Sequence, residues 1–273
     1  MSAIVRPTSD TSRLTNIRLL VDDGTIEGLS TQLADVKPDV TFHLATRFVP
    51  AHAPDQVGQL LEANIGFGTR LAEALLSSSP DTTVVNIGTA AQHYESRKYG
   101  PLSLYAATKQ AMADIMTYYA ELTPLRVVTL SLYDTYGVGD TRTKIVQLLA
   151  KATLTGEKLL MSPGKQLIDL LYVDDAIRGL VRASELAEDE KMTEYAIRSG
   201  NPVPLTELVT LFEQASGREV PVEFGAQPYR DREMLTYWDA GLTIPGWEPR
   251  ITLDEGLPLI WQEWADGRNP RLG

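Results

Sequence analysis

The most restrictive feature of this sequence is an alternation of short β-branched runs with amphipathic helical patterns. Runs rich in β-branched residues occur at residues 3–5, 18–21, 40–45, 83–87 and 126–132, and helical patterns occur at 55–76 and 105–121. Strands and helices in this alternation are typical of a parallel sheet with right-handed crossovers, covered by helices on both faces. The chain is therefore predicted to be an α/β protein with a doubly wound parallel sheet.

The alternation loosens after about residue 150. Helical patterns near 144–155, 173–184 and 206–216 are separated by short strands and by turn-rich pieces such as 161–164 and 244–247. We expect residues 1–150 to form the sheet domain and residues 151–273 to form a smaller lobe that faces the substrate.

Composition excludes several classes of partner. A net charge of -11 and a pI near 4.8 argue against nucleic acid or an anionic membrane, because both need a basic face. The chain has no cysteine, and its three histidines show no metal-ligand spacing, so no metal site is expected. No apolar run approaches the roughly 20 residues that span a bilayer, and no secretion pattern opens the chain. A cytoplasmic location is expected.

One pair of side chains indicates chemistry. Tyr105 and Lys109 are four residues apart at the start of a helical pattern, so they share one face of the helix. A nearby cation favours the phenolate over the phenol, which makes a tyrosine usable as an acid and base. Thr89 ends the preceding strand and can bind the same substrate oxygen. Taken alone, the spacing is also compatible with an ordinary amphipathic helix face.

Several further pieces, in order along the chain, resemble one family. Together they resemble the extended short-chain dehydrogenase/reductase family, in its NAD(P)-dependent epimerase/dehydratase group that works on nucleotide sugars. The match covers nearly the whole chain. Its residues are Pro38, His43, Leu44, Ala45, Asn64, Thr89, Tyr105, Lys109, Asp134, Tyr136, Gly137, Tyr172, Asp175, Pro228, Tyr229 and Arg230.

The resemblance implies a Rossmann-like fold, an NAD(P) cofactor and a nucleotide-sugar substrate. It makes Tyr105 the catalytic acid and base, with Lys109 on the nicotinamide ribose and Thr89 on the reacting oxygen. Asp134 and Arg230 would lie near the substrate diphosphate. The implied cofactor-binding residues are Arg6, Leu44, Ala45, Thr46, Asn64, Ile87, Tyr105 and Lys109. An arginine such as Arg6 at the end of the second strand suits a 2′-phosphate, so NADP is expected over NAD.

The family's first strand and glycine-rich turn have no counterpart in this sequence. Residue 1 falls where the second strand would begin, and in a sheet ordered 3-2-1-4-5-6 the missing strand is the central one. A start that falls late within a longer gene is the favoured expectation. Re-pairing of the first strands and a defective cofactor site are the alternatives.

Two smaller departures narrow the chemistry. Ala90 and Ala91 follow Thr89, where sugar dehydratases of the family carry an acidic pair, so hydride transfer is favoured over dehydration. Ile168 stands beside Asp169 where many members carry an arginine. Arg142 or Arg232 is expected to replace that arginine.

Three hypotheses for function remain. The first is a nucleotide-sugar 4-ketoreductase or 4-epimerase, the second a reductase of a non-sugar carbonyl, and the third a non-catalytic relative that has lost cofactor binding. A homodimer is expected through helix 105–121. Its exposed face is predicted to carry Met112, Met116, Tyr118 and Tyr119.

Overall fold

The computed structural model describes residues 1–186 and 192–269. The chain divides into two compact units that interleave along the sequence. Unit 1 comprises residues 1–92, 103–130 and 183–195, and unit 2 comprises residues 93–102, 131–182 and 196–273. The main segment of unit 2 therefore begins at Ser131, before the boundary expected near residue 150. No helix of the described residues is long and apolar enough to cross a membrane.

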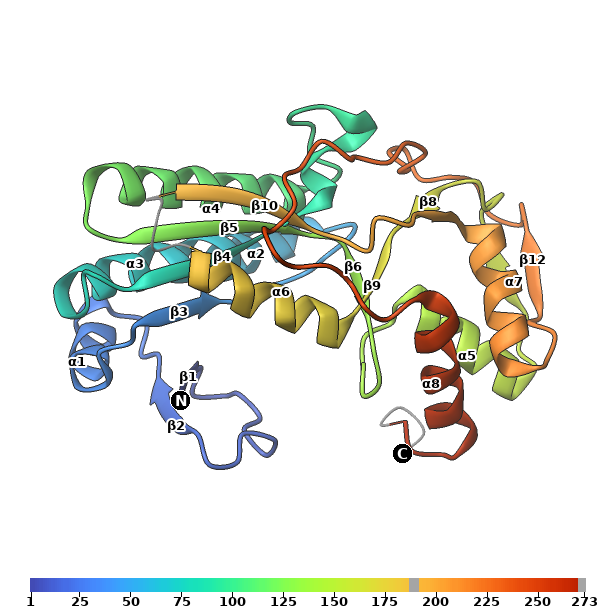
Figure 1. Cartoon of the computed structure of the whole chain (residues 1–273), viewed down its shortest axis with the longest axis horizontal. Coiled ribbons are helices and arrows are strands. Elements are labelled where there is room, and N and C mark those ends of the chain that lie inside the picture. The colour runs from blue at the N-terminus through green and yellow to red at the C-terminus, as the bar shows by residue number, and fades with distance from the viewer. Residues whose placement is uncertain (187–191, 270–273) are drawn as a thin grey trace. The chain divides into compact units, whose positions relative to one another are not determined.

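The strands confirm the predicted parallel α/β fold (Figure 1). A four-stranded sheet has the order β10-β5-β4-β3, and β1 pairs with β2 in a separate parallel sheet. Strand β3 pairs in parallel with β4, with Val40 opposite Thr83 and His43 opposite Asn86. The strands are β1 (Ser2–Val5), β2 (Arg18–Val21), β3 (Val40–His43), β4 (Thr83–Thr89), β5 (Arg126–Leu132) and β10 (Met192–Ile197).

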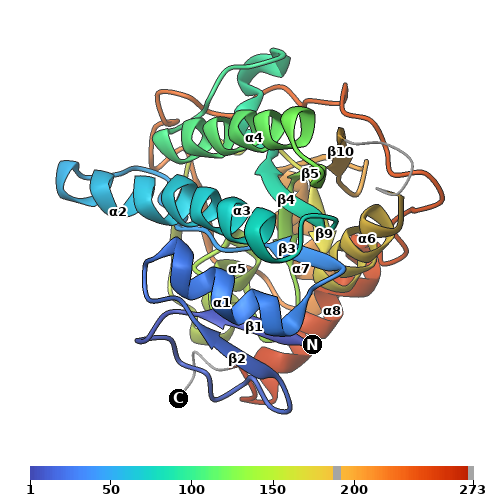
Figure 2. The ribbon, with the colours of Figure 1, turned by 90° about the vertical axis from the view of Figure 1, so that its left-hand side faces the viewer.

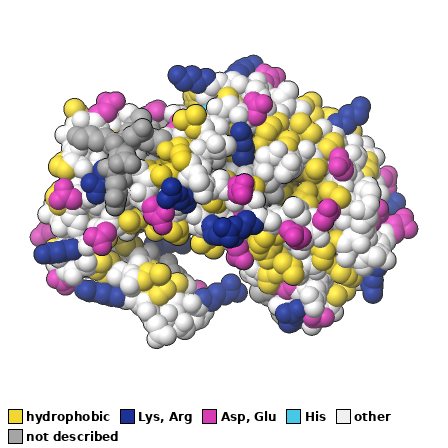
Figure 3. Space-filling model, viewed as in Figure 1, with side chains coloured by type: hydrophobic (Ala, Val, Ile, Leu, Met, Phe, Trp, Pro, Cys, Tyr) yellow, Lys and Arg dark blue, Asp and Glu magenta, His cyan; other side chains and the backbone are white. Residues whose placement is uncertain are grey.

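Strands β1 and β3 each have one strand partner in the described part of the chain (Figure 1). The β1–β2 ribbon also has one uncovered face. Leu19 and Val21 are 39% and 44% exposed, whereas Leu20, on the opposite face, is buried. Apolar side chains are visible on this part of the surface in Figure 3. An open strand edge beside an uncovered apolar face is a surface on which another strand can pair.

The helices of unit 1 are α1 (Ile26–Val36), α2 (Val57–Leu61), α3 (Phe67–Ser78) and α4 (Leu104–Leu122). Helix α1 was not predicted from the sequence, although Thr25 caps it by accepting a hydrogen bond from the Gly28 N–H (3.0 Å). The single helix expected over 55–76 is broken up. It consists of a 3₁₀ turn η1 (Pro54–Gln56), α2, a π-helical turn η2 (Glu62–Gly66) and α3.

The core of unit 1 joins the helices to the sheet. Helices α1, α3 and α4 lie side by side (Figure 2) and pack on strands β2, β4 and β5. The fully buried side chains include Leu29, Leu33, Leu71, Leu75, Val84, Met112, Met116, Leu125 and Val127. This packing fixes α4, which carries the predicted catalytic pair, against the strand that ends in Thr89.

Unit 2 is built on three helices and three short two-stranded sheets. The helices α5 (Ile145–Thr155), α7 (Leu205–Ser216) and α8 (Leu253–Ala265) bury Leu149, Phe212 and Trp264 in one core. Helix α6 (Val173–Leu186) runs from unit 2 into unit 1. The strand pairs are β6 (Asp134–Tyr136) with β9 (Leu170–Tyr172), β7 (Leu159–Met161) with β12 (Val222–Phe224), and β8 (Leu167–Ile168) with β11 (Val203–Pro204).

Candidate active site

The predicted catalytic pair lies in the first turns of α4. Ser103 caps the helix by accepting a hydrogen bond from the Ala106 N–H (3.3 Å), which places Tyr105 at the second helical position. Lys109 follows one turn later on the same face and is 1% exposed. Burial lowers the pKa of Lys109 to about 8, so its ammonium is still charged at neutral pH. The helical spacing places this cation on the same face of α4 as Tyr105.

Thr89 ends β4 and is linked to α4 by two glutamines. The Thr89 N–H donates to Gln92 Oε1 (2.8 Å), and Gln92 Nε2 donates to Gln110 Oε1 (2.7 Å). Gln92 is buried and Gln110 directly follows Lys109. Thr89 Oγ1 accepts a hydrogen bond from the Ala91 N–H (3.3 Å). Sequence reasoning missed both glutamines, because neither belongs to a recognisable motif.

Asn64 joins the loop after β3 to helix α4 through hydrogen bonds. Its Oδ1 accepts hydrogen bonds from Thr46 Oγ1 (3.1 Å) and the Arg47 N–H (2.7 Å). Its Nδ2 donates to the Arg47 carbonyl (3.2 Å) and to Thr108 Oγ1 (2.9 Å). Thr108 Oγ1 in turn donates to the Tyr105 carbonyl (2.7 Å). These bonds engage both the oxygen and the nitrogen of the Asn64 amide in this structure, and its expected contact with a cofactor stays a prediction.

The loop that follows β3 contacts Tyr105, the predicted catalytic tyrosine. Leu44, Ala45 and Thr46 are exposed at the carboxyl end of β3. Two residues later, the ring of Phe48 packs edge-on against the ring of Tyr105, with centroids 5.0 Å apart. Ligands of doubly wound sheets bind outside the carboxyl ends of the strands. The position of this loop therefore agrees with a cofactor site beside Tyr105.

Arg6 and Ile87 lie beside and within two other strands of unit 1, β1 and β4. Arg6 directly follows β1 and is exposed, and its backbone N–H donates to Ser9 Oγ (3.1 Å). Ile87 is partly buried within β4, two residues before Thr89. Both residues lie at or near the carboxyl end of their strand, where a dinucleotide would bind in this fold.

His43 lies behind the catalytic pair. It is 1% exposed, and its Nδ1 lies 3.1 Å from Asn86 Oδ1. Burial, together with a smaller contribution from the charge of Lys109, lowers the pKa of His43 from 6.5 to about 4. The imidazole is therefore neutral at physiological pH and serves as a core side chain.

The predicted substrate residues lie in unit 2. Asp134 Oδ1 forms an ion pair with Lys144 Nζ (2.7 Å). Arg230 is exposed, and its guanidinium has no hydrogen-bond or ion-pair partner among residues 1–186 and 192–269. An exposed and uncommitted guanidinium is suited to an anionic ligand.

The two arginines expected to replace the missing one beside Asp169 are already engaged. Arg142 binds the Asp140 carboxylate (2.8 Å) and the Thr135 carbonyl (3.0 Å), closing its own loop. Arg232 donates to the Pro101 carbonyl and lies over the Tyr94 ring, 5.5 Å from its centroid. Both side chains therefore have structural contacts that a ligand would have to break.

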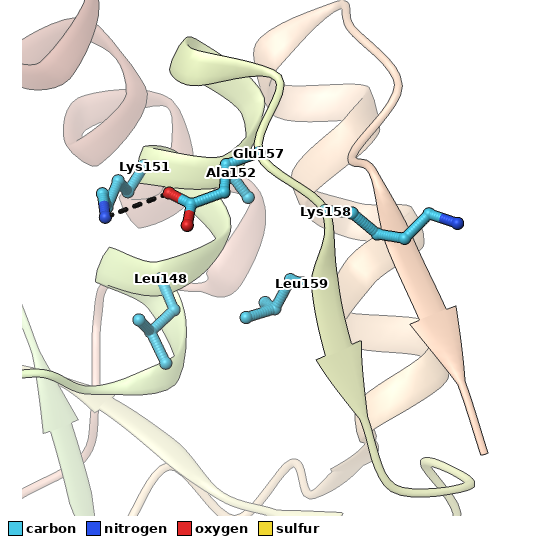
Figure 4. A pocket seen from close by; sticks show the side chains of 6 residues that line it. All are labelled: Leu148, Lys151, Ala152, Glu157, Lys158 and Leu159. Carbon is cyan, nitrogen blue, oxygen red and sulfur yellow. Dashed lines mark ion pairs between the residues drawn. The ribbon is translucent and has the colours of Figure 1, made fainter. Parts of the chain in front are cut away.

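A small cavity of unit 2 lies between the end of α5 and β7 (Figure 4). Lys151 and Glu157 form an ion pair at its rim (3.2 Å), and Leu148 and Leu159 line its apolar part. None of the predicted site residues lines this cavity, so we assign it no role in the site.

The sequence analysis placed four residues on the exposed face of α4, at a dimer interface, but three of the four are buried. Met112 and Met116 are fully buried in the core of unit 1, and Tyr119 is 4% exposed. Tyr119 donates a hydrogen bond to Glu73 Oε1 (2.7 Å). Of the four residues named for that face, Tyr118 alone is exposed, because the apolar stripe of α4 faces the sheet.

The fold and the site define a class of protein. A parallel α/β sheet, a strand that ends in a hydroxyl, and a tyrosine and a lysine four residues apart on the next helix are the features that the sequence analysis expected of a nicotinamide-dependent enzyme. Residues 7–197 match the model of the NAD dependent epimerase/dehydratase family, and the chain belongs to this family. The predicted enzyme class and the predicted NAD(P) cofactor class are confirmed by that membership.

Relatives of known name agree with the family. The chain is 25% identical over 243 residues to UDP-glucuronate 4-epimerase 5 of Arabidopsis thaliana, covering 79% of this chain and 55% of the relative. It is 23% identical over 248 residues to CDP-abequose synthase of Salmonella typhimurium, covering 89% of this chain and 79% of the relative. The chain thus spans little more than half the length of the plant epimerase.

Solved structures confirm the fold. UDP-glucose 4-epimerase from Thermotoga maritima, solved with UDP-glucose, superposes with a TM-score of 0.79 at 20% identity, covering 96% of this chain and 90% of that one. MoeE5 in complex with UDP-glucose and NAD superposes with a TM-score of 0.77 at 22% identity, covering 97% and 90%. The expected Rossmann-like α/β architecture is therefore confirmed.

Proposed function

We propose that this protein is a nucleotide-sugar 4-ketoreductase or 4-epimerase, in which Tyr105 moves a proton at the sugar oxygen during hydride transfer. The observation that carries the proposal is the placement of Tyr105, Lys109 and Thr89 within one unit, on α4 and at the end of β4. Family membership and relatives named as nucleotide-sugar enzymes support the substrate class.

The side chains divide the work by their chemistry. Tyr105, as phenolate, takes the proton of a sugar hydroxyl, and as phenol returns a proton to the ketone oxygen. The buried Lys109 ammonium lies one turn away and favours the phenolate. The Thr89 hydroxyl holds the same sugar oxygen, while the link through Gln92 fixes its backbone.

Residues at the carboxyl ends of three strands would hold NAD(P), which supplies or accepts the hydride when bound. They are Arg6 after β1, Leu44, Ala45 and Thr46 after β3, and Ile87 in β4, together with Asn64, Tyr105 and Lys109. The exposed guanidinium of Arg6 suits the 2′-phosphate of NADP. Arg230, in unit 2, would bind the substrate diphosphate, and Asp134 would lie near it.

Two further observations bear on the type of reaction and on the assembly. Ala90 and Ala91 supply no carboxyl group beside Thr89, which favours hydride transfer over loss of water. Tyr118 and Leu122 of α4 are 57% and 70% exposed. This exposed apolar surface is smaller than expected, and a homodimer through α4 remains a proposal. The cytoplasmic location also stays a prediction.

The test is turnover of nucleotide sugars by the wild type and by Tyr105→Phe. We expect the variant to lose at least about 100-fold in kcat, as for a lost general acid and base, with an unchanged circular dichroism spectrum. Tyr118→Phe is the matched control, since it removes an exposed hydroxyl from the same helix. Near-normal turnover by Tyr105→Phe would refute the proposal.

Two other functions make different predictions in the same assay. A reductase of a non-sugar carbonyl would turn over such a carbonyl but no nucleotide sugar, and Arg230→Gln would leave its KM unchanged. A non-catalytic relative would show no turnover with either substrate class and no binding of NADH or NADPH in a titration.

A further inference from the structure

A long segment of unit 2 carries Arg230 without regular secondary structure. Between β12, which ends at Phe224, and α8, which begins at Leu253, the described chain forms no helix or strand. Residues 229–239 of this segment are here named the strap. A segment without a helix or sheet ladder keeps one conformation only where other bonds fix it.

The strap is held by bonds along its whole length. At its start, Tyr229 Oη accepts a hydrogen bond from the Lys165 N–H (3.1 Å). In its middle, the Met234 carbonyl accepts one from the Leu167 N–H (3.2 Å). At its end, the Trp238 carbonyl accepts hydrogen bonds from Tyr133 Oη and from Arg198 Nη1 (3.2 Å). The backbone of the strap is therefore attached at several points.

One contact differs from these because it involves a buried carboxylate. Asp169 is 4% exposed; its Oδ1 accepts the Ser199 N–H (2.7 Å) and its Oδ2 accepts the Gly200 N–H (2.9 Å). Oδ2 also accepts a hydrogen bond from Tyr237 Oη (2.9 Å). A buried carboxylate is stable only with such donors, so the Tyr237 hydroxyl completes its set.

Tyr237 keeps its hydroxyl proton and therefore remains the hydrogen-bond donor to Asp169. Burial raises the pKa of the Tyr237 hydroxyl well above its ordinary value, and the Asp169 charge raises it further. The Tyr237 carbonyl is held as well, by Ser96 Oγ (2.8 Å). Arg198 lies over the Tyr237 ring, 5.7 Å from its centroid. Side chain, ring and backbone of this one residue are thus all fixed.

We propose that Asp169 and Tyr237 are positioning residues that fix the strap so that Arg230 can bind the diphosphate of a nucleotide substrate. The inference rests on the proposed function for the identity of the ligand. Arg230 itself is exposed and has no partner in the described part of the chain, so its position depends on the attachment of the strap on either side of it. If the strap were mobile, ordering it when the ligand binds would cost conformational entropy and would weaken binding.

The first experiment measures binding of UDP and CDP to the full chain by calorimetry. We expect Tyr237→Phe to weaken binding of the better nucleotide about 10- to 100-fold, the effect of losing a hydrogen bond to a charged group. Tyr119→Phe is the matched control, because it also removes a tyrosine hydroxyl from a carboxylate, that of Glu73, but in unit 1. We expect it to leave nucleotide binding unchanged.

A double-variant cycle tests whether the pair acts through Arg230. In an Arg230→Gln background, Tyr237→Phe should have no further effect on nucleotide binding, because the group that the strap positions is gone. Equal losses with and without Arg230 would overturn the proposal. In steady-state turnover, Tyr237→Phe should raise KM for the nucleotide sugar and leave kcat unchanged.

Hydrogen exchange of the ligand-free chain supplies an independent readout. We expect faster amide exchange within 229–239 in Tyr237→Phe and Asp169→Asn, with the unfolding midpoint of Tyr237→Phe close to that of Tyr119→Phe. Unchanged exchange in the strap would overturn the proposal whatever binds. If the wild type binds neither UDP nor CDP, the proposed function and the ligand assigned here both fail. If the wild type binds and Tyr237→Phe binds equally well, the positioning role alone fails.

Discussion

Replacement of Lys109 by methionine should make this protein more stable while removing its activity. Lys109 is 1% exposed, and burial lowers its pKa from 10.5 to about 8. That change corresponds to about 3 kcal/mol of unfavourable free energy for the charged form in the folded state. Because lysine is charged in both states at pH 7, the fold carries this whole cost there. Methionine has a similar length and no charge.

We expect Lys109→Met to raise the free energy of unfolding at pH 7 by roughly 1 to 3 kcal/mol, since methionine does not reproduce the lysine shape in full. The gain should depend on pH. Between pH 8 and 10.5 the unfolded lysine holds a proton that the folded one has lost, so the stability of the wild type rises with pH over this window. The advantage of the variant should therefore disappear by pH 10.5.

Urea denaturation of both proteins at pH 7 and pH 10.5 measures this difference. Lys158→Met is the control, because the side chain of Lys158 is 63% exposed and should show no such gain. Turnover of Lys109→Met should fall at least about 100-fold, since the phenolate of Tyr105 loses its cation. A variant that is less stable than the wild type at pH 7, or a gain that persists at pH 10.5, would refute this account of Lys109.

Two further predictions concern pH and assembly. His43 has a folded pKa of about 4, below its ordinary 6.5, so stability should fall as the pH drops from 6.5 to 4; urea midpoints should show this slope, and His43→Gln should flatten it. Light scattering should report a dimer at micromolar concentration, and Tyr118→Glu should give a monomer; a monomeric wild type would count against the proposed interface.

The sheet was predictable from sequence because its signal is local. Strand β2 and strand β5 fall at the residues predicted, since short β-branched runs between turns have few alternatives. The placement of Tyr105 and Lys109 on one face of α4 was predictable for a similar reason, because a spacing of four residues on a helix fixes a common face. Helix α1 was missed although Thr25 is a recognisable cap, because its apolar stripe is short.

Features that depend on long-range packing could not be predicted in the same way. The apolar residues of α4 were assigned to an exposed face, but the sheet covers Met112 and Met116 and leaves Tyr118 in solvent. The role of Asn64 depends on Thr46, Arg47 and Thr108, which are distant or inconspicuous in the sequence. The bond between Asp169 and Tyr237 joins residues 68 positions apart, and no local pattern announces it.

The open edges of β1 and β3 also affect how the chain behaves in concentrated solution. An exposed strand edge is a template for pairing with another molecule. Two different open edges on one molecule allow a contact between unlike surfaces, which does not close into a dimer and can repeat from molecule to molecule. Above the micromolar range in which the dimer through α4 is expected, the chain should therefore form larger assemblies that grow with concentration. A strand that paired with these edges would prevent this growth and would extend the sheet at the same time.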